Sequence, residues 1–431
     1  MFQPTGFNDL ADKRVGIFGF GVEGRATLER IKPLTPSIVV VDDASVAPDV
    51  LVTSEGGLAA LMACDVVLKS PGIARRRHDV LDLELHGIKV TSALNLWLSE
   101  VDLRRVIAIT GTKGKSTTTA LITFFMHCLG EEAHRLGNIG QPPYDPSLDL
   151  SKGWLVLEVS SYQCADLEVS PAIVVVTSLG ADHLDWHGSL EQYHYDKLSI
   201  TRHSEEHTTL VPNNPTFLQL DQLIGGELHF IDPESSHLAE ALGLIGSHSA
   251  SNVALAAQAV ALATGRSFTD VIEQVRSRAS EFEPLKGRLT LVASEPRGTG
   301  ALRYVDDGLA TAPLPTAAAL EAFADVPVVL LAGGFDRGVD YQPLADALRA
   351  RNQMTVVLTM GPAGERIATS LSDSVEHRHI ANLEEGVRIG RELLTNGGVV
   401  LLSPAAPSFD AYKNWEERSN DFVRVVRELV R

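Results

Sequence analysis

Short apolar runs alternate with helix-forming stretches along the chain, and glycine or polar residues follow many of the apolar runs. In the first hundred residues, an apolar run after Lys13 leads into a glycine turn, a helix-forming stretch to Ile31 and a second apolar run at residues 38–41. This order is typical of a βαβ unit. Further short strands are expected at residues 66–68 and 89–91.

A second block opens at residues 105–110 with an apolar run, which a glycine loop and a helix-forming stretch follow directly. Later strands are expected at residues 154–159 and 173–177. The alanine-rich residues 247–264 predict a helix, because alanine has the highest helix propensity. Residues 281–286 contain a proline and are interpreted as a linker.

The third block begins near Gly287 and carries nearly continuous apolar runs, as a parallel sheet covered on both faces requires. Helix patterns lie between these runs, for example at residues 316–323 and 416–430. Strands are expected at residues 289–293, 302–305, 326–331, 355–359 and 398–402.

The pattern therefore predicts an α/β protein of three domains. The expected boundaries are 1–100 for a Rossmann-like domain, 101–285 for a central P-loop ATPase-like domain with a mostly parallel sheet, and 286–431 for a C-terminal Rossmann-like domain. A length of 431 residues agrees with about three domains at roughly 150 residues each.

The composition is that of an ordinary globular protein, with 44% hydrophobic and 21% charged residues. It excludes a disordered chain, a collagen-like chain and a small disulfide-rich domain. The net charge of −18 argues against nucleic acid or an anionic membrane as the main partner. Three widely spaced cysteines favour a reducing cytoplasm. We expect neither a signal peptide nor a membrane-spanning helix.

The strongest local motif is the glycine loop from Gly111 to Ser116, which lies between a predicted strand and a predicted helix. Such a loop points backbone N–H groups into one cavity, and the following helix N-terminus adds positive potential. Lys115 is expected to contact phosphate oxygens, and the Ser116 hydroxyl to bind Mg²⁺. The loop is two residues shorter than the usual P-loop spacing, which argues against an ordinary GTPase.

Gly19, Gly21 and Gly24 match the spacing of a dinucleotide-binding turn, and Asp42 lies near the position of a ribose-binding acid. On this pattern alone, NAD would be the usual prediction. Any tight turn between a strand and a helix can use glycines, however. The pattern supports only a nucleotide or a diphosphate held at a helix N-terminus.

Several polar residues follow predicted strands of the first two blocks. Ser70 belongs to a turn that could bind an anion, although most such turns have no ligand. Glu158 ends an apolar strand, where a carboxylate beside a phosphate loop is a natural Mg²⁺ ligand. His183 could contact a metal or phosphate. Lys197, taken alone, would be interpreted as a surface lysine.

Three loops of the third block also follow strands, beginning at Asp306, Gly333 and Ser403. Their small and polar residues describe one rim of a parallel sheet, where ligands bind in α/β folds. Arg337, in the second loop, could hold a carboxylate through two hydrogen bonds.

Together these motifs resemble the Mur ligases, and most closely their MurD type, over nearly the whole chain. The resemblance rests on GFGVEGRA, KSPGI, GTKGKSTTT, GNIGQPP, EVSSYQ, DHLDWHGSLEQYHYDK, LLAGGFDRG and LLSPAAPSFDAYKNWEERSNDF. GTKGKSTTT is shared with folylpolyglutamate synthases, whereas SPGI, SSYQ and the last segment are specific to the MurD type. In that family, the first glycine turn holds the UDP of the substrate, so the predicted ligand of this turn is UDP rather than NAD.

The resemblance implies an ATP- and Mg²⁺-dependent ligase that joins glutamate to UDP-N-acetylmuramoyl-L-alanine in peptidoglycan synthesis. It implies catalytic roles for Lys115, Lys197 and His183, and a reaction of Lys197 with CO₂ to form a carbamate. The implied metal ligands are Ser116, Glu158, His183 and Lys197. The implied ATP contacts are Gly111, Thr112, Lys113, Gly114, Lys115, Ser116, Thr117, Arg288 and Asp307. The implied UDP-substrate contacts are Gly21, Val22, Asp42, Ser70, Asn138, Ser160 and Gln163, and the implied glutamate contacts are Thr311, Arg337, Ser408 and Trp415.

The chain departs from the usual MurD pattern around the expected glutamate site. Gly308 and Leu309 stand in place of a Ser-Lys pair, Arg337 in place of a lysine and Trp415 in place of a phenylalanine. These segments resemble the subgroup that adds L-glutamate, which we favour over D-glutamate. The remaining alternatives are a folylpolyglutamate synthase and a nucleotide-binding regulator without activity. We expect a cytoplasmic monomer with small-molecule substrates.

Overall fold

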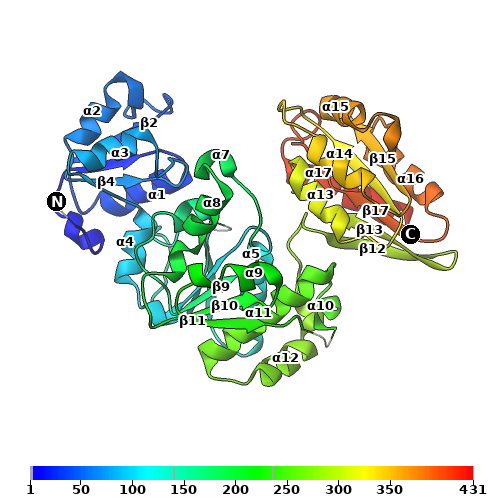
Figure 1. Cartoon of the computed structure of the whole chain (residues 1–431), viewed down its shortest axis with the longest axis horizontal. Coiled ribbons are helices and arrows are strands. Elements are labelled where there is room, and N and C mark those ends of the chain that lie inside the picture. The colour runs from blue at the N-terminus through cyan, green and yellow to red at the C-terminus, as the bar shows by residue number, and fades with distance from the viewer. Residues whose placement is uncertain (1–2, 139–140, 235–236, 431) are drawn as a thin grey trace. The chain divides into compact units, whose positions relative to one another are not determined.

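The computed structural model describes residues 3–138, 141–234 and 237–430 (Figure 1). The chain forms two compact units, and each is described here by itself. The first unit contains the described residues up to 234 together with residues 251–278, and the second contains residues 237–250 and 279–430. The first unit carries two parallel sheets and the second unit carries one mixed sheet.

The first sheet has the strand order β3-β2-β1-β4-β5, and its paired strands are parallel. Because β2 and β4 lie on opposite sides of β1, the strand order reverses at the carboxyl end of β1, where α/β sheets bind ligands. The strands are β1 (Val15–Phe18), β2 (Ile38–Asp42), β3 (Leu51–Val52), β4 (Val66–Lys69) and β5 (Lys89–Thr91). The helices are α1 (Val22–Ile31), α2 (Gly57–Met62), α3 (His78–Leu85) and α4 (Ala93–Glu100).

The second sheet has the order β11-β10-β9-β6-β8-β7 and is also parallel. Its order reverses at β6, so the glycine loop after β6 lies at the second reversal point of the unit. The strands are β6 (Val106–Thr110), β7 (Ala133–Gly137), β8 (Trp154–Glu158), β9 (Ile173–Val176), β10 (Thr208–Pro212) and β11 (Glu227–Ile231). The helices are α5 (Lys115–Cys128), α6 (Ser161–Cys164), α7 (Leu184–His187), α8 (Leu190–Lys197), α9 (Pro215–Gln219), α10 (Leu238–Ala241), α11 (Ser247–Thr264) and α12 (Phe268–Ser277). Of these, α10 and residues 247–250 of α11 belong to the second unit.

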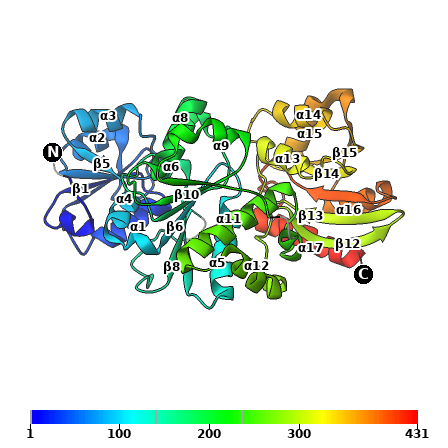
Figure 2. The same cartoon turned by 60° about the horizontal axis from the view of Figure 1, so that its bottom comes forward.

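The third sheet has the order β12-β13-β17-β14-β15-β16, and helices cover both of its faces (Figure 2). Alternate strand residues pack against α13, α14 and α15 on one face and against α16 and α17 on the other. The strands are β12 (Thr290–Arg297), β13 (Gly300–Asp306), β14 (Val328–Gly333), β15 (Thr355–Met360), β16 (Glu376–His379) and β17 (Gly398–Leu402). The helices are α13 (Pro313–Glu321), α14 (Gln342–Arg349), α15 (Gly361–Leu371), α16 (Leu383–Leu393) and α17 (Trp415–Leu429).

The predicted α/β class is confirmed, but several strands have no counterpart among the predictions. The strands β11 and β16 form sheet edges, and their exposed or half-exposed residues lack a continuous apolar run. The edge strand β12 pairs antiparallel with β13, so the third sheet is mixed rather than parallel. In the part of the chain that the structure describes, no helix is long and apolar enough to cross a membrane.

The turn between β1 and α1 depends on a close approach of two backbone segments. A Cβ atom added to Gly24 would lie 2.1 Å from the carbonyl oxygen of Gly19, whereas one added to Gly21 would meet nothing within 4 Å. We therefore predict that Gly24→Ala lowers the free energy of unfolding by about 1–3 kcal/mol, because helix α1 must shift away from the turn.

The measurement is urea unfolding followed by circular dichroism, with Gly21→Ala as the matched control. The control should unfold close to the wild type. Equal midpoints for the two variants would contradict the tight packing of α1 on this turn.

Candidate active site

The glycine loop joins the buried strand β6 to helix α5 at the carboxyl edge of the second sheet. Gly111 has φ 144° and Gly114 has φ 87°, conformations that other residues rarely adopt. A Cβ atom on Gly111 would lie 2.1 Å from Thr177 Oγ1. The backbone conformation and the packing therefore both require glycine at position 111. The loop enters the helix with the geometry of a phosphate-binding turn.

Two lysine side chains converge on the carbonyl oxygen of Gly111. Lys115 Nζ and Lys197 Nζ each donate a hydrogen bond to it at 2.8 Å, and Lys115 also reaches the Thr112 carbonyl at 3.2 Å. Lys197 is 1% exposed. Burial, and next the nearby Lys115 cation, lower the pKa of Lys197 to about 7. A substantial fraction of this amine is therefore neutral near pH 7 and can act as a nucleophile.

Glu158 lies beside the glycine loop, because its strand β8 pairs with β6 in a register that places Glu158 opposite Ile109. The side chain is 1% exposed, and its Oε1 accepts a hydrogen bond from Asn138 Nδ2 at 2.9 Å. Its Oε2 is buried without a hydrogen-bond partner. A buried carboxylate oxygen of this kind is suited to a hard cation such as Mg²⁺.

Ser116 follows Lys115 in the first turn of α5 and is buried. His183 has φ 51° and lies before α7, where its half-exposed ring packs against Tyr162 with ring centres 4.8 Å apart. Over residues 3–138, 141–234 and 237–430, no three His, Cys, Asp or Glu side chains gather as a metal-binding group.

The predicted UDP edge of the first sheet is held by hydrogen bonds within the turn. Ser70 Oγ donates to the Gly19 carbonyl at 2.7 Å, and the Phe20 amide donates to Asp42 Oδ2 at 2.6 Å. Asp42 thus stabilises the glycine turn. Val22 begins α1 and is 75% exposed, so this helix N-terminus is open.

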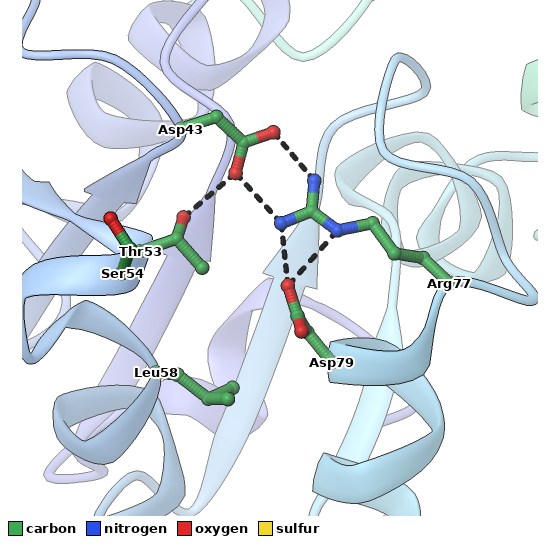
Figure 3. Close-up of a pocket in the computed structure, with 6 residues that line it drawn as sticks. All are labelled: Asp43, Thr53, Ser54, Leu58, Arg77 and Asp79. Carbon is green, nitrogen blue, oxygen red and sulfur yellow. Dashed lines mark hydrogen bonds and ion pairs between the residues drawn. The ribbon is translucent and has the colours of Figure 1, made fainter.

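A pocket of about 280 Å³ lies next to this edge and is shown in Figure 3. Arg77 bridges two carboxylates in it, reaching Asp43 at 2.5 and 2.7 Å and Asp79 at 2.5 and 3.0 Å. The hydrogen bonds to Asp43 raise the pKa of Arg77, and those from Arg77 lower the pKa of Asp43. The lining residues are Asp43, Thr53, Ser54, Leu58, Arg77 and Asp79. The sequence analysis singled out Asp42 at the end of β2 but none of the residues that line this pocket.

Buried polar contacts join the first sheet to the second. Glu23 Oε2 accepts a hydrogen bond from Tyr144 Oη at 2.9 Å, and Glu23 Oε1 accepts one from Gln163 Nε2 at 2.7 Å. Gln163 also closes a capping box with Ser160 at the start of α6. The two predicted substrate residues Ser160 and Gln163 therefore hold the backbone of the site in place.

Lys69 and Asp166 form an ion pair at 2.6 Å, and both side chains are fully buried. Lys69 also donates to the Ile73 carbonyl at 2.8 Å, which fixes the turn after Ser70. Burial lowers the pKa of Lys69 and raises that of Asp166. Sequence analysis missed this pair, although a lysine at the end of an apolar strand is a signal for a buried partner.

The rim of the third sheet contains a buried arginine that sequence analysis also missed. Arg418 of α17 is 1% exposed and donates to three loop carbonyls, those of Ala406 at 3.0 Å and of Gly308 and Gly333 at 3.3 Å. Burial lowers the pKa of Arg418 to about 10. One guanidinium thus ties together the three loops that we predicted on this rim.

The predicted ligand residues of the rim fall into buried and exposed groups. Asp307 accepts a hydrogen bond from Ser403 Oγ at 2.7 Å, and burial raises its pKa to about 7. Ser408 Oγ is buried without a hydrogen-bond partner. Trp415 packs on Gly287, where an added Cβ atom would lie 2.6 Å from the indole ring. Thr311 is half-buried, whereas Arg288 and Arg337 are exposed.

These features define an α/β protein with phosphate-type turns at two sheet reversal points. Residues 109–224 match the family model described as Mur ligase middle domain. The chain is 36% identical to a UDP-N-acetylmuramoyl-L-alanine–L-glutamate ligase of Micromonospora sp., with 98% of both chains covered. It is 30% identical to a UDP-N-acetylmuramoylalanine–D-glutamate ligase of Geobacillus kaustophilus, over 99% of this chain and 100% of that one.

A solved structure, UDP-N-acetylmuramate–alanine ligase MurC of Thermotoga maritima, shares the fold at a TM-score of 0.52. Its sequence identity is 18%, with 97% of this chain and 100% of that one covered. The chain belongs to the Mur ligase family.

The low pKa of Lys197 has a measurable consequence. Trace labelling with acetic anhydride reports the neutral fraction of a lysine, and we predict a half-maximal rate at Lys197 near pH 7. Lys115→Met should move that midpoint to higher pH, because it removes a repelling cation. Peptide mass spectrometry measures the label on each lysine. A midpoint near the ordinary lysine value of about 10.4 would contradict the burial of the amine.

Proposed function

We propose that this protein is an ATP-dependent ligase that joins L-glutamate to UDP-N-acetylmuramoyl-L-alanine in peptidoglycan precursor synthesis. The observation that carries the proposal is one sheet edge where the glycine loop, two lysine ammonium groups and a partnerless Glu158 oxygen meet. Family membership and the names of the relatives support the same reaction. ATP is the expected source of the phosphoryl group.

The chemical problem is that a carboxylate is a poor electrophile. Transfer of the γ-phosphoryl group of ATP to the alanyl carboxylate forms an acyl phosphate, whose leaving group is phosphate. In this proposal, the Lys115 ammonium and the amide N–H groups at the start of α5 stabilise the charge on the transferred group. The neutral amine of glutamate then attacks the acyl carbon and forms the new C–N bond. The C–O bond to phosphate breaks, the phosphate leaves with the former carboxylate oxygen, and the amine nitrogen loses one proton to water or to the phosphate.

The residues around Glu158 fit a magnesium ion. Its buried, partnerless oxygen and the buried Ser116 hydroxyl supply the oxygen ligands that Mg²⁺ prefers, and phosphate oxygens and water would complete the shell. We assign His183 to the same site by family resemblance. When bound, Mg²⁺ would withdraw charge from the phosphate oxygens.

Lys197 is the proposed site of carbamate formation. Because its pKa is about 7, a substantial fraction of the amine is neutral near pH 7. The neutral amine can attack the carbon of CO₂ and release one proton to water. The product is an anionic oxygen ligand beside Lys115. The cation at position 197, which repels the Lys115 ammonium group, thus becomes an anion that attracts it. We infer that the carbamate stabilises the Lys115 ammonium group at the glycine loop.

We place the UDP portion of the substrate at the open N-terminus of α1, next to Gly21, Val22 and Ser70. The exposed start of this helix offers backbone N–H groups to a diphosphate. The adjacent pocket has a polar rim with Arg77 and one apolar wall at Leu58, a combination suited to a nucleobase. Asn138 would reach the substrate from the second sheet.

We propose that glutamate is contacted by four residues of the unit that carries the third sheet, namely Arg337, Thr311, Ser408 and Trp415. We propose contacts to ATP for Arg288 and Asp307. The partnerless Ser408 hydroxyl and the exposed Arg337 are available for carboxylate oxygens. Leu309 replaces the usual lysine of this rim and supplies no charge. We favour L-glutamate, in line with the name of the relative at 36% identity.

The experiment is phosphate release from ATP with UDP-N-acetylmuramoyl-L-alanine and each pure glutamate enantiomer. The proposal predicts release that depends on both substrates and is faster with L-glutamate. Faster turnover of D-glutamate would overturn the assignment of the isomer. Turnover only with a folate substrate would favour a folylpolyglutamate synthase, and ATP binding without any release would favour a regulator.

The carbamate role predicts a specific rescue. Lys197→Ala should lower kcat by about 10²–10³, because one charged group of the site is lost. Short carboxylic acids such as formate or acetate should restore part of the activity, since they supply the missing anion. Lys152→Ala, at an exposed lysine, is the control for the substitution itself and for the added acids. Full activity of Lys197→Ala without added acid would contradict the role.

A further inference from the structure

A chain of polar contacts, buried except at Arg76, runs from the loop after Ser70 to the helix that carries Lys197. Arg76 forms two hydrogen bonds with Asp196, from Nη1 to Oδ2 at 2.8 Å and from Nη2 to Oδ1 at 2.6 Å. Asp196 is 3% exposed and immediately precedes Lys197 in α8. The first sheet thus contacts the position next to the proposed carbamate lysine.

The chain of contacts continues on the other side of Asp196. His187 Nδ1 lies 2.7 Å from Asp196 Oδ2, and His187 Nε2 lies 3.0 Å from Ser161 Oγ. His187 and Ser161 are each 3% exposed. Because a carboxylate oxygen can only accept, His187 Nδ1 donates to Asp196, and Ser161 Oγ is the partner of Nε2. Ser161 begins α6, directly after the Ser160 cap and three residues after the end of β8.

Asp196 is held as a carboxylate by these partners. Arg76, His187 and Gln192 surround it and each contacts a carboxylate oxygen. Gln192 Nε2 donates to Oδ1 at 2.8 Å, so both carboxylate oxygens are occupied. A fully partnered, buried carboxylate defines one arrangement of the groups around it.

A second route leads from His187 to the glycine loop. The ring of Tyr193 meets the His187 ring edge to face, with centres 5.1 Å apart, and Lys197 Nζ lies 4.9 Å from the Tyr193 ring centre. Tyr193 Oη lies 2.8 Å from Thr112 Oγ1. His187 therefore supports Lys197 through the ring of Tyr193 as well as through Asp196.

Ser161, His187 and Asp196 have the hydrogen-bond order of a nucleophilic triad, but a hydrolytic role does not fit. The Ser161 side chain is buried, and Arg76 neutralises Asp196 through two hydrogen bonds. A nucleophile needs access to the substrate and stabilisation of an oxyanion. The arrangement fits a role in orienting other groups.

We propose that Asp196 and His187 are positioning residues that hold Lys197 against the glycine loop and couple it to the substrate loop of the first sheet through Arg76. The proposal deepens the proposed function and rests on it for its kinetic readout. Neither side chain is assigned a contact with substrate. Their effect passes through α8 and through the hydrogen bonds of the network.

The central test compares Asp196→Asn with Glu191→Gln, an exposed carboxylate on the same helix. Asp196→Asn should lower kcat by about 10–100-fold with an unchanged KM for glutamate, as losses of supporting residues commonly do. Glu191→Gln should leave kcat unchanged. Equal kcat values for both variants would overturn the proposal. Circular dichroism and the urea midpoint confirm that each variant is folded.

Two substitutions of His187 separate positioning from simple destabilisation. In His187→Asn the amide nitrogen replaces Nδ1 and can still donate to Asp196, whereas in His187→Gln it replaces Nε2 and reaches only Ser161. The proposal predicts at least about a tenfold higher kcat for the Asn variant than for the Gln variant. Equal kcat values or the reverse order would contradict it.

A double-mutant cycle tests the coupling to the first sheet. If Arg76 acts through Asp196, Arg76→Met together with Asp196→Asn should lower kcat no further than Asp196→Asn alone. Independent, multiplying effects would contradict the coupling.

Hydrogen exchange distinguishes failure of this proposal from failure of the proposed function, because it needs no turnover. In Asp196→Asn, backbone amides of residues 194–198 and 74–77 should exchange at least about tenfold faster than in Glu191→Gln. Unchanged exchange would overturn the network even in an active ligase. Faster exchange in a protein without ligase activity would support the network and overturn the function instead.

Discussion

The convergence of two lysine side chains on one backbone carbonyl is the constraint on which the active site depends. Buried Lys197 and half-buried Lys115 share the Gly111 oxygen as acceptor, so both amino groups are tied to the glycine loop. When both amino groups are protonated their charges repel each other, which is one cause of the lowered pKa of Lys197. The arrangement favours any change that brings negative charge, either phosphate oxygens or conversion of Lys197 to an anion.

Further buried charged groups of the same unit hold its two sheets in one arrangement. Glu23 joins α1 to Tyr144 and Gln163, and Lys69 is paired with Asp166 away from water. Buried ion pairs add little net stability, but removal of one partner leaves an unpaired charge at a large cost. We interpret these contacts as fixing the substrate edge of the first sheet relative to the phosphate loop of the second.

Much of the fold could be predicted because its signals are local. The glycine loop after β6 and the turn after β1 are each encoded within about twenty residues. The proximity of Lys197 to Gly111 was not predictable from spacing, since 86 residues separate them. Only the family resemblance assigned Lys197 to the active site. The domain boundaries, the individual ligand contacts, the cytoplasmic location and the monomeric state remain predictions.

The buried contacts of several polar residues could not be predicted from the sequence. Asp42, Ser160 and Gln163 remain predicted substrate contacts, and each also has a hydrogen bond that maintains the backbone of the site. Asp166 and Arg418 were not noticed at all. Their partners lie far away in the sequence, so only the folded structure reveals that these polar groups are buried and what they bind.

Isotope transfer tests the acyl phosphate most directly. The substrate UDP-N-acetylmuramoyl-L-alanine, labelled with ¹⁸O in its carboxylate, is turned over with ATP and L-glutamate, and the released phosphate is analysed by mass spectrometry. The account predicts one labelled oxygen in each phosphate, because the former carboxylate oxygen leaves with the phosphoryl group. Unlabelled phosphate, or label in AMP, would contradict activation at the glycine loop by γ-phosphoryl transfer.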